Sequence, residues 1–479
     1  DFLIGTGNGM GLSFQQRKRL SIAIEMAASP SVIFLDEPTS GLESRAALIV
    51  MRSLKRIADT GRTVCATIHQ PSAICFDMFD DLLLLRKGGE VVFFGETGRN
   101  SETMISYFES RGGRPIQHGE NAANWMLNIV ASGPMSGGDF ADHYKQSDEY
   151  RSLRAELQRI TTNRDSSHKL EYDTQYAVDE PTRNQLMNER LITIYWRSPA
   201  YNRTRLIICA LVAFIISSVF VGQEPEIITE TYMTSLISTI FIAFIMVGVL
   251  SITTVLPVMH EIREVFYRHR SSGMLDARSL ALALGVAEQG FICLASALFC
   301  FVFYPSLGMN MDAWNFLCFW GFFTFNLAIY SYFGQAFMCS VEGMGTAQIL
   351  ASIFIGINNF FSGLIVRPQF MSGVLSITYW ITPGHYVFEG ILMNQYRSDN
   401  RTVLASEGTE FYNSLIESGV CLLNETQCFG NVTHYVDVFF GGRFDETHII
   451  PNVLVLGLYL VVARLLTYLA LAHFNYSST

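Results

Sequence analysis

Long apolar segments dominate the chain after Tyr201, whereas apolar and polar positions are mixed before it. A helix crosses the hydrocarbon core of a bilayer with about 20 predominantly apolar residues. The pattern therefore predicts an all-α domain of six transmembrane helices, at residues 206–221, 235–258, 277–304, 313–338, 345–366 and 450–472. Before them, residues 183–197 mix aromatic and basic side chains, which is typical of an interfacial helix in the headgroup layer.

The first third of the chain predicts a different architecture. Val32 to Leu35 is a continuous apolar run, the pattern of a strand buried on both faces of a parallel sheet, and Thr63 to Ile68 is a second β-rich run. Residues 140–160 read as a polar helix, and residues 161–181 lack apolar periodicity. We therefore expect three parts: an α/β domain at 1–131, a polar helix and linker at 132–182, and a transmembrane domain at 183–479.

Two carboxylates stand where the first predicted strand ends. Asp36 and Glu37 directly follow the apolar run, and ligands bind at the carboxyl ends of parallel strands. Such a pair suits nucleotide hydrolysis, with the first carboxylate holding Mg²⁺ and the second polarising the attacking water. A turn or a helix cap formed by Asp-Glu-Pro is the alternative reading of these residues alone.

Two further elements favour the nucleotide reading. Ser13 is a good N-cap, so the helix that it begins would offer free backbone N–H groups and a positive dipole end to a phosphate. His69 follows the second β-rich run, and we expect it beside the carboxylates.

Four segments, in this order, resemble the motifs of ATP-binding-cassette (ABC) ATPases. They are a signature loop (Leu12, Ser13, Phe14, Gln15 and Gln16), a Walker B strand ending in Asp36 and Glu37, a D-loop (Ser40, Gly41, Leu42 and Glu43) and a switch histidine, His69. The resemblance implies part of an α/β P-loop ATPase with a parallel sheet that uses ATP and Mg²⁺. The resemblance also implies that Glu37 and His69 are catalytic and that Asp36 binds the Mg²⁺ ion. The signature loop would contact the ATP molecule bound at the opposite nucleotide site.

The sequence resembles one subfamily in particular. The stretch GLSFQQRKRLSIAIEMAASPSVIFLDEPTSGL, together with residues 121–127 and 265–268, resembles the second half of full-size pleiotropic-drug-resistance transporters of the G subfamily. The sequence departs from that pattern at Phe14-Gln15, where Gly-Gly is standard, at Glu43, where Asp is usual, and at Ile262, where Glu is usual.

The resemblance implies a function and a set of partners. These residues contain no Gly-x-x-x-x-Gly-Lys-Ser/Thr loop, so we expect a fragment that is inactive alone and works with an N-terminal half or a second half-transporter. The expected activity is ATP-driven export of hydrophobic or amphipathic compounds or lipids. The alternative is a membrane regulator or channel that nucleotide gates without powering transport.

Charge distribution predicts the orientation. The segment after the second span carries Arg263, Arg268 and Arg270, whereas residues 222–234 hold three Glu and no Lys or Arg. The ATPase part is therefore expected in the cytosol of a plasma-membrane protein, with residues 368–449 as an extracellular loop. That loop carries glycosylation sequons at Asn400, Asn424 and Asn431, whereas those at Asn202 and Asn475 fall inside.

Composition adds two constraints. The net charge of −10 argues against nucleic-acid binding, and a hydrophobic share of 49% agrees with a membrane protein. Of the nine cysteines, Cys421 and Cys428 lie in the predicted outer loop, where a disulfide is expected because that compartment is oxidising. Two free thiols, or bonds to another chain, are the alternatives.

Polar and aromatic residues in the spans suggest the transport path. Glu288 lies about halfway along the third span and either faces a substrate path or bonds to a neighbouring helix. The resembled family has its cavity between the second and fifth spans, so Phe241, Phe244, Asn358 and Phe361 are candidates to line it, with plain packing as the alternative. Residues 261–268 are expected to form a cytosolic loop that docks on the ATPase, through Arg263, Phe266, Tyr267 and Arg268.

Overall fold

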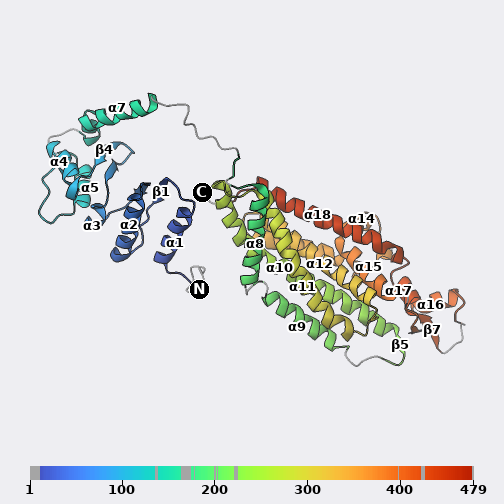
Figure 1. Ribbon diagram of the computed structural model, residues 1–479. Helices are drawn as coiled ribbons and strands as arrows, with labels where there is room; N and C mark the ends of the chain where they lie inside the picture. Colours follow the sequence, from blue (N-terminus) through green and yellow to red (C-terminus); the bar gives the residue numbers. More distant parts are fainter. Residues whose placement is uncertain are drawn as a thin grey trace. The chain divides into compact units, whose positions relative to one another are not determined.

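The computed structural model describes residues 11–134, 139–162, 174–176, 178–198, 201, 203–220, 225–397, 399–421 and 427–476. The chain divides into two compact units, Asp1–Glu171 and Tyr172–Thr479 (Figure 1). The division falls within residues 161–181, the segment whose sequence lacks apolar periodicity. Each unit is described by itself.

The first unit mixes helices with short strands. It contains α1 (Phe14–Met26), β1 (Val32–Asp36), α2 (Ser44–Ala58), β2 (Thr63–Thr67), α3 (Ala73–Phe76), β3 (Asp81–Leu85), β4 (Val91–Glu96), the 3₁₀ turn η1 (Arg99–Ser101), α4 (Glu102–Ser110), α5 (Ala122–Ser132), α6 (Phe140–Lys145) and α7 (Asp148–Thr162). Strands β1 and β2 pair in parallel with Asp36 opposite Thr67, and β3 pairs with β4 in antiparallel. Helix α2 buries Ala46, Val50 and Leu54, the spacing of an amphipathic helix.

The prediction that β1 is buried on both faces is wrong in this structure. Ile33 is buried, but Phe34 is 79% exposed. Successive side chains of a strand point to opposite faces, and the exposure of β1 alternates accordingly, with Val32 and Phe34 on a face that is left open. The main core of the unit forms elsewhere, around Phe108 and Trp125, whose indole Nε1–H donates to the Arg114 carbonyl oxygen at 3.1 Å.

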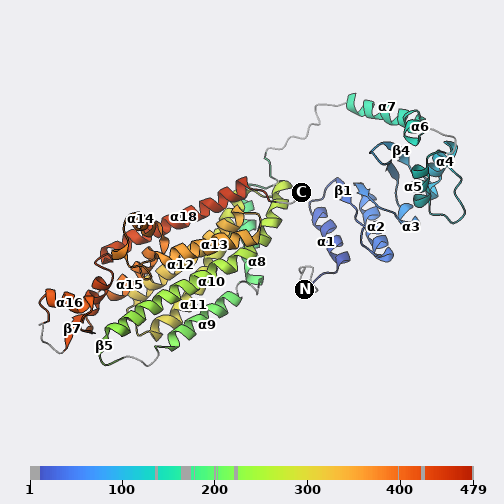
Figure 2. The ribbon, with the colours of Figure 1, turned by 180° about the vertical axis from the view of Figure 1, so that it is seen from behind.

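The second unit is mostly helical. It contains α8 (Glu180–Arg197), α9 (Thr204–Ser218), β5 (Ile228–Thr229), α10 (Glu230–Ser271), α11 (Ala277–Ser306), α12 (Ala313–Ser340), α13 (Met344–Phe360), η4 (Pro368–Phe370), α14 (Val374–Ile381), α15 (Pro383–Tyr396), β6 (Thr402–Ala405), α16 (Glu410–Glu417), β7 (Cys428–Asn431), α17 (Val432–Phe439), η5 (Glu446–His448) and α18 (Ile449–His473). Figures 1 and 2 show α10, α11, α12 and α18 running side by side, with α12 in contact with the other three.

Four helical segments of the described residues are long and apolar enough to cross a membrane: 230–271, 277–306, 313–340 and 446–473. The other two predicted spans are shorter than expected, because α9 ends at Ser218 and α13 at Phe360. At a rise of about 1.5 Å per residue, the 17 residues of α13 extend about 26 Å, slightly less than the hydrocarbon core. Beyond α13 the chain leaves the helical conformation at Gly363, whose φ is +106°.

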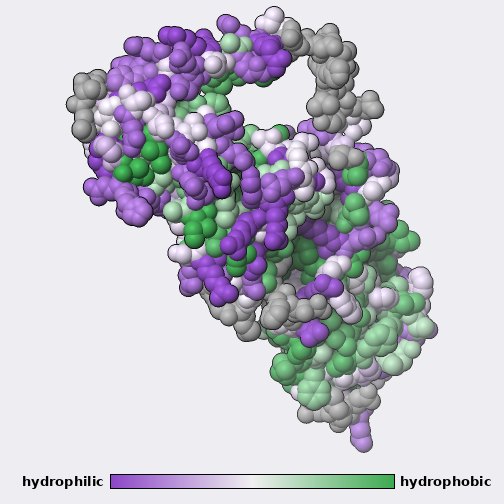
Figure 3. All heavy atoms as spheres, turned by 60° about the vertical axis from the view of Figure 1, so that its left-hand side comes forward, coloured by the Kyte–Doolittle hydropathy of each residue, from purple (hydrophilic) through white to green (hydrophobic). Residues whose placement is uncertain are grey.

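The surface of the second unit suits a lipid environment. Phe214 of α9 and Leu454, Leu458 and Val461 of α18 are all more than half exposed. Figure 3 shows hydrophobic side chains gathered over the surface of this helical unit. Exposed apolar area on this scale is unusual in water but expected of helices that face acyl chains.

Residues 368–449, predicted as an extracellular loop, contain helices and strands, and one of the helices enters the helical packing. Residues 383–396 form α15, which is almost entirely buried and packs against α12 and α18. Glycines allow this close approach, because a Cβ at Gly390 would lie 2.3 Å from the Phe322 ring and one at Gly384 would lie 2.8 Å from the Asn358 carbonyl oxygen. Strands β6 and β7 of this region join β5 in a three-stranded sheet, with α16 and α17 nearby in the chain. A disulfide joins Cys421 to Cys428 with a Cα–Cα distance of 5.8 Å.

Candidate functional site

The strand ends of the first unit bring two carboxylates and a threonine together. The hydroxyl of Thr67, at the end of β2, donates to Asp36 Oδ1 at 2.6 Å and accepts from the backbone N–H of Glu37 at 2.9 Å. Glu37 has a φ of +43°, so the chain turns sharply at the second carboxylate. Both acidic side chains are exposed, and among the described residues neither Asp36 Oδ2 nor the Glu37 carboxylate has a protein partner.

Helix α1 reaches the same strand end. Ser13 is its N-cap: the Ser13 hydroxyl accepts from Gln16 N, and the Gln16 side chain accepts from Ser13 N at 2.8 Å, a complete capping box. One turn later, Lys18 Nζ donates to the carbonyl oxygens of Glu37 at 2.9 Å and Ser40 at 2.8 Å. The signature-like segment and the strand end are therefore joined by direct hydrogen bonds.

The D-loop segment completes this region. Gly41 has a φ of +69°, and a Cβ there would lie 3.1 Å from the Phe14 ring. Glu43 is the N-cap of α2 but makes no side-chain capping bond. A cavity of about 960 Å³ is lined by Glu37, residues 39–42 including Leu42, the exposed His69 and polar side chains of α5, namely Asn124 and Asn128.

The structure thus brings together most of the residues singled out in the first unit. Glu37, Gly41, Leu42 and His69 line one cavity, whereas Asp36 does not line it and accepts a hydrogen bond from Thr67. Sequence reasoning gave no role to Thr67 or Lys18. A threonine ending the strand that pairs with the acidic strand was an available signal, but the reach of Lys18 depends on how α1 packs.

Glu288 lies in a closed polar network and not on an open path. Its side chain is 0% exposed, and it accepts from Arg205 Nη1 at 2.7 Å and from the Tyr201 hydroxyl at 2.7 and 2.8 Å. Arg205 Nη2 also donates to the hydroxyls of Ser331, at 2.9 Å, and Ser251. The network links α9, α10, α11 and α12, which favours the structural alternative for Glu288. The sequence analysis did not single out Arg205, because this residue directly precedes the predicted first span.

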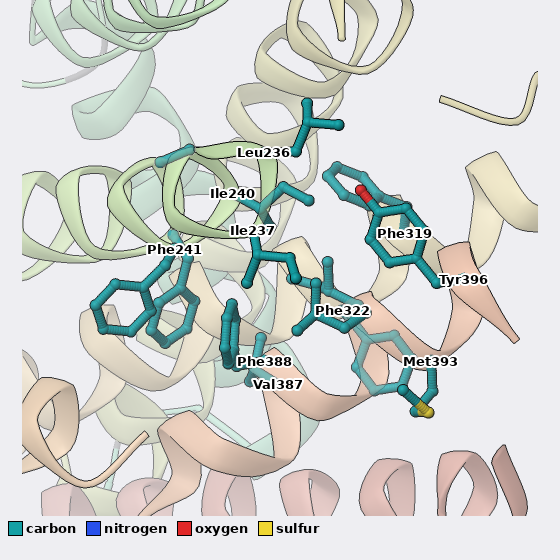
Figure 4. Packing of buried hydrophobic residues seen from close by; sticks show 14 of the residues in the cluster. Leu236, Ile237, Ile240, Phe241, Phe319, Phe322, Val387, Phe388, Met393 and Tyr396 are labelled. Atoms are coloured by element: carbon teal, nitrogen blue, oxygen red, sulfur yellow. The ribbon is translucent and has the colours of Figure 1, made fainter. Parts of the chain in front are cut away.

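The aromatic candidates of the second span are packed inside the unit. Phe241 and Phe244 are 4% and 0% exposed, and their ring centroids lie 5.2 and 6.4 Å from that of Phe388 on α15. Figure 4 shows Phe241 and Phe388 within this packing. The Asn358 amide is also buried and engaged: Nδ2 donates to the Tyr330 hydroxyl and Oδ1 accepts from Gly384 N, both at 2.8 Å. Phe361 is half-buried. In this structure these side chains make packing contacts.

The prediction of a loop at residues 261–268 is wrong, because the segment continues α10 as a helix. Arg263 is buried and caps the end of α12, donating to the carbonyl oxygens of Met338, Val341 and Glu342, the last at 2.6 Å. Phe266 and Tyr267 are buried as well. The exposed side chains of the segment are Glu261, Glu264, Val265 and Arg268.

The predicted modification sites are partly described. Asn400 and Asn431 are exposed, and Asn431 Oδ1 caps α17 by accepting from His434 N at 2.8 Å. Asn424 lies outside the described residues.

Comparison with known proteins identifies the family. Residues 182–396 match the ABC-2 type transporter family. The chain is 36% identical over 410 residues to pleiotropic drug resistance protein 1 of Nicotiana tabacum, which covers 84% of this chain and 29% of that protein. It is 31% identical over 456 residues to ABC transporter G family member 31 of Arabidopsis thaliana, covering 95% of this chain and 31% of that protein. The chain belongs to the ABC transporter G family.

This assignment confirms the resemblance stated from the sequence. A third G family protein, member 42 of Oryza sativa subsp. japonica, is 35% identical over 402 residues, which are 83% of this chain and 27% of that protein. The G-family chain thus spans about three tenths of the length of the curated relatives it matches. Its apolar helices and ABC-2 domain make it an integral membrane protein.

Proposed function

We propose that this chain is the C-terminal half of a pleiotropic-drug-resistance type exporter that uses ATP hydrolysis to move hydrophobic or amphipathic compounds or lipids. The observation that carries the proposal is the arrangement at the strand ends, where Thr67 holds Asp36 and positions the backbone of Glu37. A chain that carries both this arrangement and an ABC-2 domain has parts suited to hydrolysis and to transport.

The first unit supplies residues that fit a nucleotide and Mg²⁺. Asp36 Oδ2 is free and exposed, which suits a carboxylate that holds Mg²⁺ together with phosphate oxygens. Among the described residues no group of three or more His, Cys, Asp or Glu forms a metal cage, and Mg²⁺ does not need one when phosphates complete its shell. The bound ion would neutralise phosphate charge. Glu37 would orient the attacking water, and His69 would contact the terminal phosphate from across the cavity.

The signature-like segment serves a different nucleotide in this proposal. The N-terminus of α1 would face ATP bound mainly by an opposite half, either the N-terminal half of the same transporter or a second half-transporter. Ser13 already accepts from Gln16 N, and Phe14 replaces the glycine that would let a phosphate approach the backbone closely. We therefore infer unequal sites, with fast hydrolysis at Glu37 and retention of nucleotide at Ser13.

Transport requires that hydrolysis reach the helical unit. The exposed face of the α10 end, with Glu261, Glu264 and Arg268, would dock on the ATPase, and the buried Arg263 would pass the movement to α12. The path itself would open between α10 and α13, where Phe241, Phe244, Asn358 and Phe361 would separate from their packing partners. The ATPase part would lie in the cytosol, and the glycosylated end would lie outside a plasma membrane.

The test uses the complete transporter in inside-out vesicles. Glu37→Gln should reduce ATPase activity and substrate flux together by about 10²–10⁴, because it removes the water-orienting carboxylate. Glu102→Gln, at an exposed position of α4 that does not line the cavity, is the matched control and should retain most of both activities. Flux that continues with a non-hydrolysable nucleotide would refute powered transport and support a nucleotide-gated regulator or channel.

A further inference from the structure

A second polar cavity lies in the helical unit, away from the nucleotide residues and from the Glu288 network. It has a volume of about 440 Å³ and is formed by the turn between α11 and α12, the end of α15 and the segment before β6. Its lining is almost wholly polar: Asn310, Asp312, Trp314, Asn315, Asn394, Gln395, Arg397, Asp399 and Arg401, with Gly308.

The position of the cavity sets its environment. Helices α11 and α12 are both long and apolar enough to cross a membrane, so the short turn that joins them lies at a membrane surface. Trp314 is 64% exposed, as expected of an indole at the headgroup level. Phe301 of α11 and Leu317 of α12 are also at least half exposed, which suits contact with acyl chains.

Two buried amides in the lining each keep one hydrogen-bonding group unused. Gln395 is 4% exposed; its Oε1 accepts from the Tyr304 hydroxyl at 3.0 Å, and its Nε2 has no partner among the described residues. Asn394 is 2% exposed; its Nδ2 donates to the Asn315 carbonyl oxygen at 2.8 Å, and its Oδ1 likewise has no partner within the described part of the chain. Both residues are more than nine-tenths buried and line the cavity, so a ligand or water bound there can satisfy their unused groups.

The charges of the lining select the ligand. Asp399 and Arg401 neutralise each other in a pair whose Arg401 Nη2 to Asp399 Oδ2 distance is 2.6 Å. Arg397 is exposed and has no ion-pair partner in the described structure. Asp312 uses Oδ2 to cap α12, at 3.1 Å from Trp314 N, and its Oδ1 remains free. The cavity therefore presents one available positive and one available negative group.

We propose that this cavity binds the headgroup of an ethanolamine phospholipid. Arg397 and Gln395 Nε2 donate to the phosphate, and the primary ammonium donates to Asp312 Oδ1 and Asn394 Oδ1 beside the Trp314 ring. The acyl chains follow Phe301 and Leu317. A choline headgroup has no N–H to donate, and a glycerol headgroup has no positive charge for Asp312, so both should bind more weakly. The site is independent of the proposed transport cargo.

The test counts bound lipid by native mass spectrometry of the purified full chain in detergent, with phosphatidylethanolamine, phosphatidylcholine or phosphatidylglycerol added at equal concentrations. Arg397→Gln should lower retention of phosphatidylethanolamine about tenfold, the value of one charge-assisted hydrogen bond. Asp312→Asn keeps a helix-capping side chain but removes its charge, so it should abolish the selectivity for ethanolamine over choline. Arg397→Lys should restore part of the retention.

Arg443→Gln is the matched control, because Arg443 is also exposed but does not line the cavity. The Arg443→Gln variant should retain as much phosphatidylethanolamine as the unmodified chain. Equal retention of the three lipids, or an Arg397→Gln variant that binds like the control, would overturn the proposal. Equally tight binding of soluble glycerophosphoethanolamine would show a site for a free metabolite and would also overturn it. Unchanged elution in size-exclusion chromatography verifies that each variant is folded.

Discussion

The buried pair between Arg205 and Glu288 offers a sharp test of how the helical unit is held together. Glu288→Gln keeps the shape of the side chain and one acceptor oxygen but removes the negative charge. Arg205 would then stay buried with only neutral partners: the amide oxygen that the substitution keeps and the hydroxyls of Tyr201, Ser251 and Ser331. Because these hydroxyls still solvate the guanidinium partly, we expect a loss near the lower limit for a broken buried pair, about 3 kcal/mol.

Removing both charges should be less harmful than removing one. In the double variant Arg205→Met with Glu288→Gln no uncompensated charge remains, so we expect a loss of about 1 kcal/mol. The interaction energy between the two positions should then be at least about 2 kcal/mol.

The assay is thermal unfolding of the purified chain in one detergent at one scan rate, followed by intrinsic fluorescence. For a unit of the size of Tyr172–Thr479, a loss of about 3 kcal/mol corresponds to a decrease in Tm of roughly 5 °C. Glu264→Gln on the exposed side of α10 is the matched control and should leave Tm nearly unchanged. If the Tm of Glu288→Gln equals that of the control, the reasoning fails. It also fails if the destabilisation of the double variant equals the sum of those of Glu288→Gln and Arg205→Met, because Glu288 and Arg205 are then not energetically coupled.

Three further predictions concern packing, topology and the nucleotide sites. Gly390→Ala should lower stability by about 1–3 kcal/mol, because its Cβ would overlap the Phe322 ring, whereas Gly356→Ala on α13, with nothing within 4 Å, should not; equal Tm values would contradict the packing of α15. Asn400→Gln, Asn424→Gln and Asn431→Gln together should abolish the mobility shift on deglycosylation, whereas Asn475→Gln should preserve it; a glycan on Asn475 would invert the proposed orientation. Ser13→Ala should lower the stability of α1 by about 1 kcal/mol, because it removes the N-cap, but should leave most of the ATPase activity of the complete transporter. A loss of ATPase activity as large as that of Glu37→Gln would establish equivalent sites.

The sequence alone predicted the features that depend on local periodicity. The apolar runs located the long helices α10, α11, α12 and α18, because the length needed to cross a bilayer is a property of a single segment. Ser13 could be predicted as an N-cap because capping involves residues three positions apart. The motif order around Asp36 and His69 indicated the family, since it is itself a pattern along the chain.

Tertiary structure decided which distant groups meet. The sequence predicted residues 383–396 as part of an outer loop. In the structure Gly390 and Gly384 allow Phe322 and Asn358 to approach closely, so α15 packs against α12 and α18. Glu288 could be recognised as unusual, yet its partner Arg205 lies 83 residues earlier in the chain and outside the predicted span. The apolar run of β1 predicted that Phe34 is buried, but Phe34 is exposed, because burial depends on which elements cover each face of the sheet. Local patterns determine the conformation of a segment, but contacts between segments depend on side-chain volumes and on unpaired charges and polar groups, which become neighbours only after the helices pack.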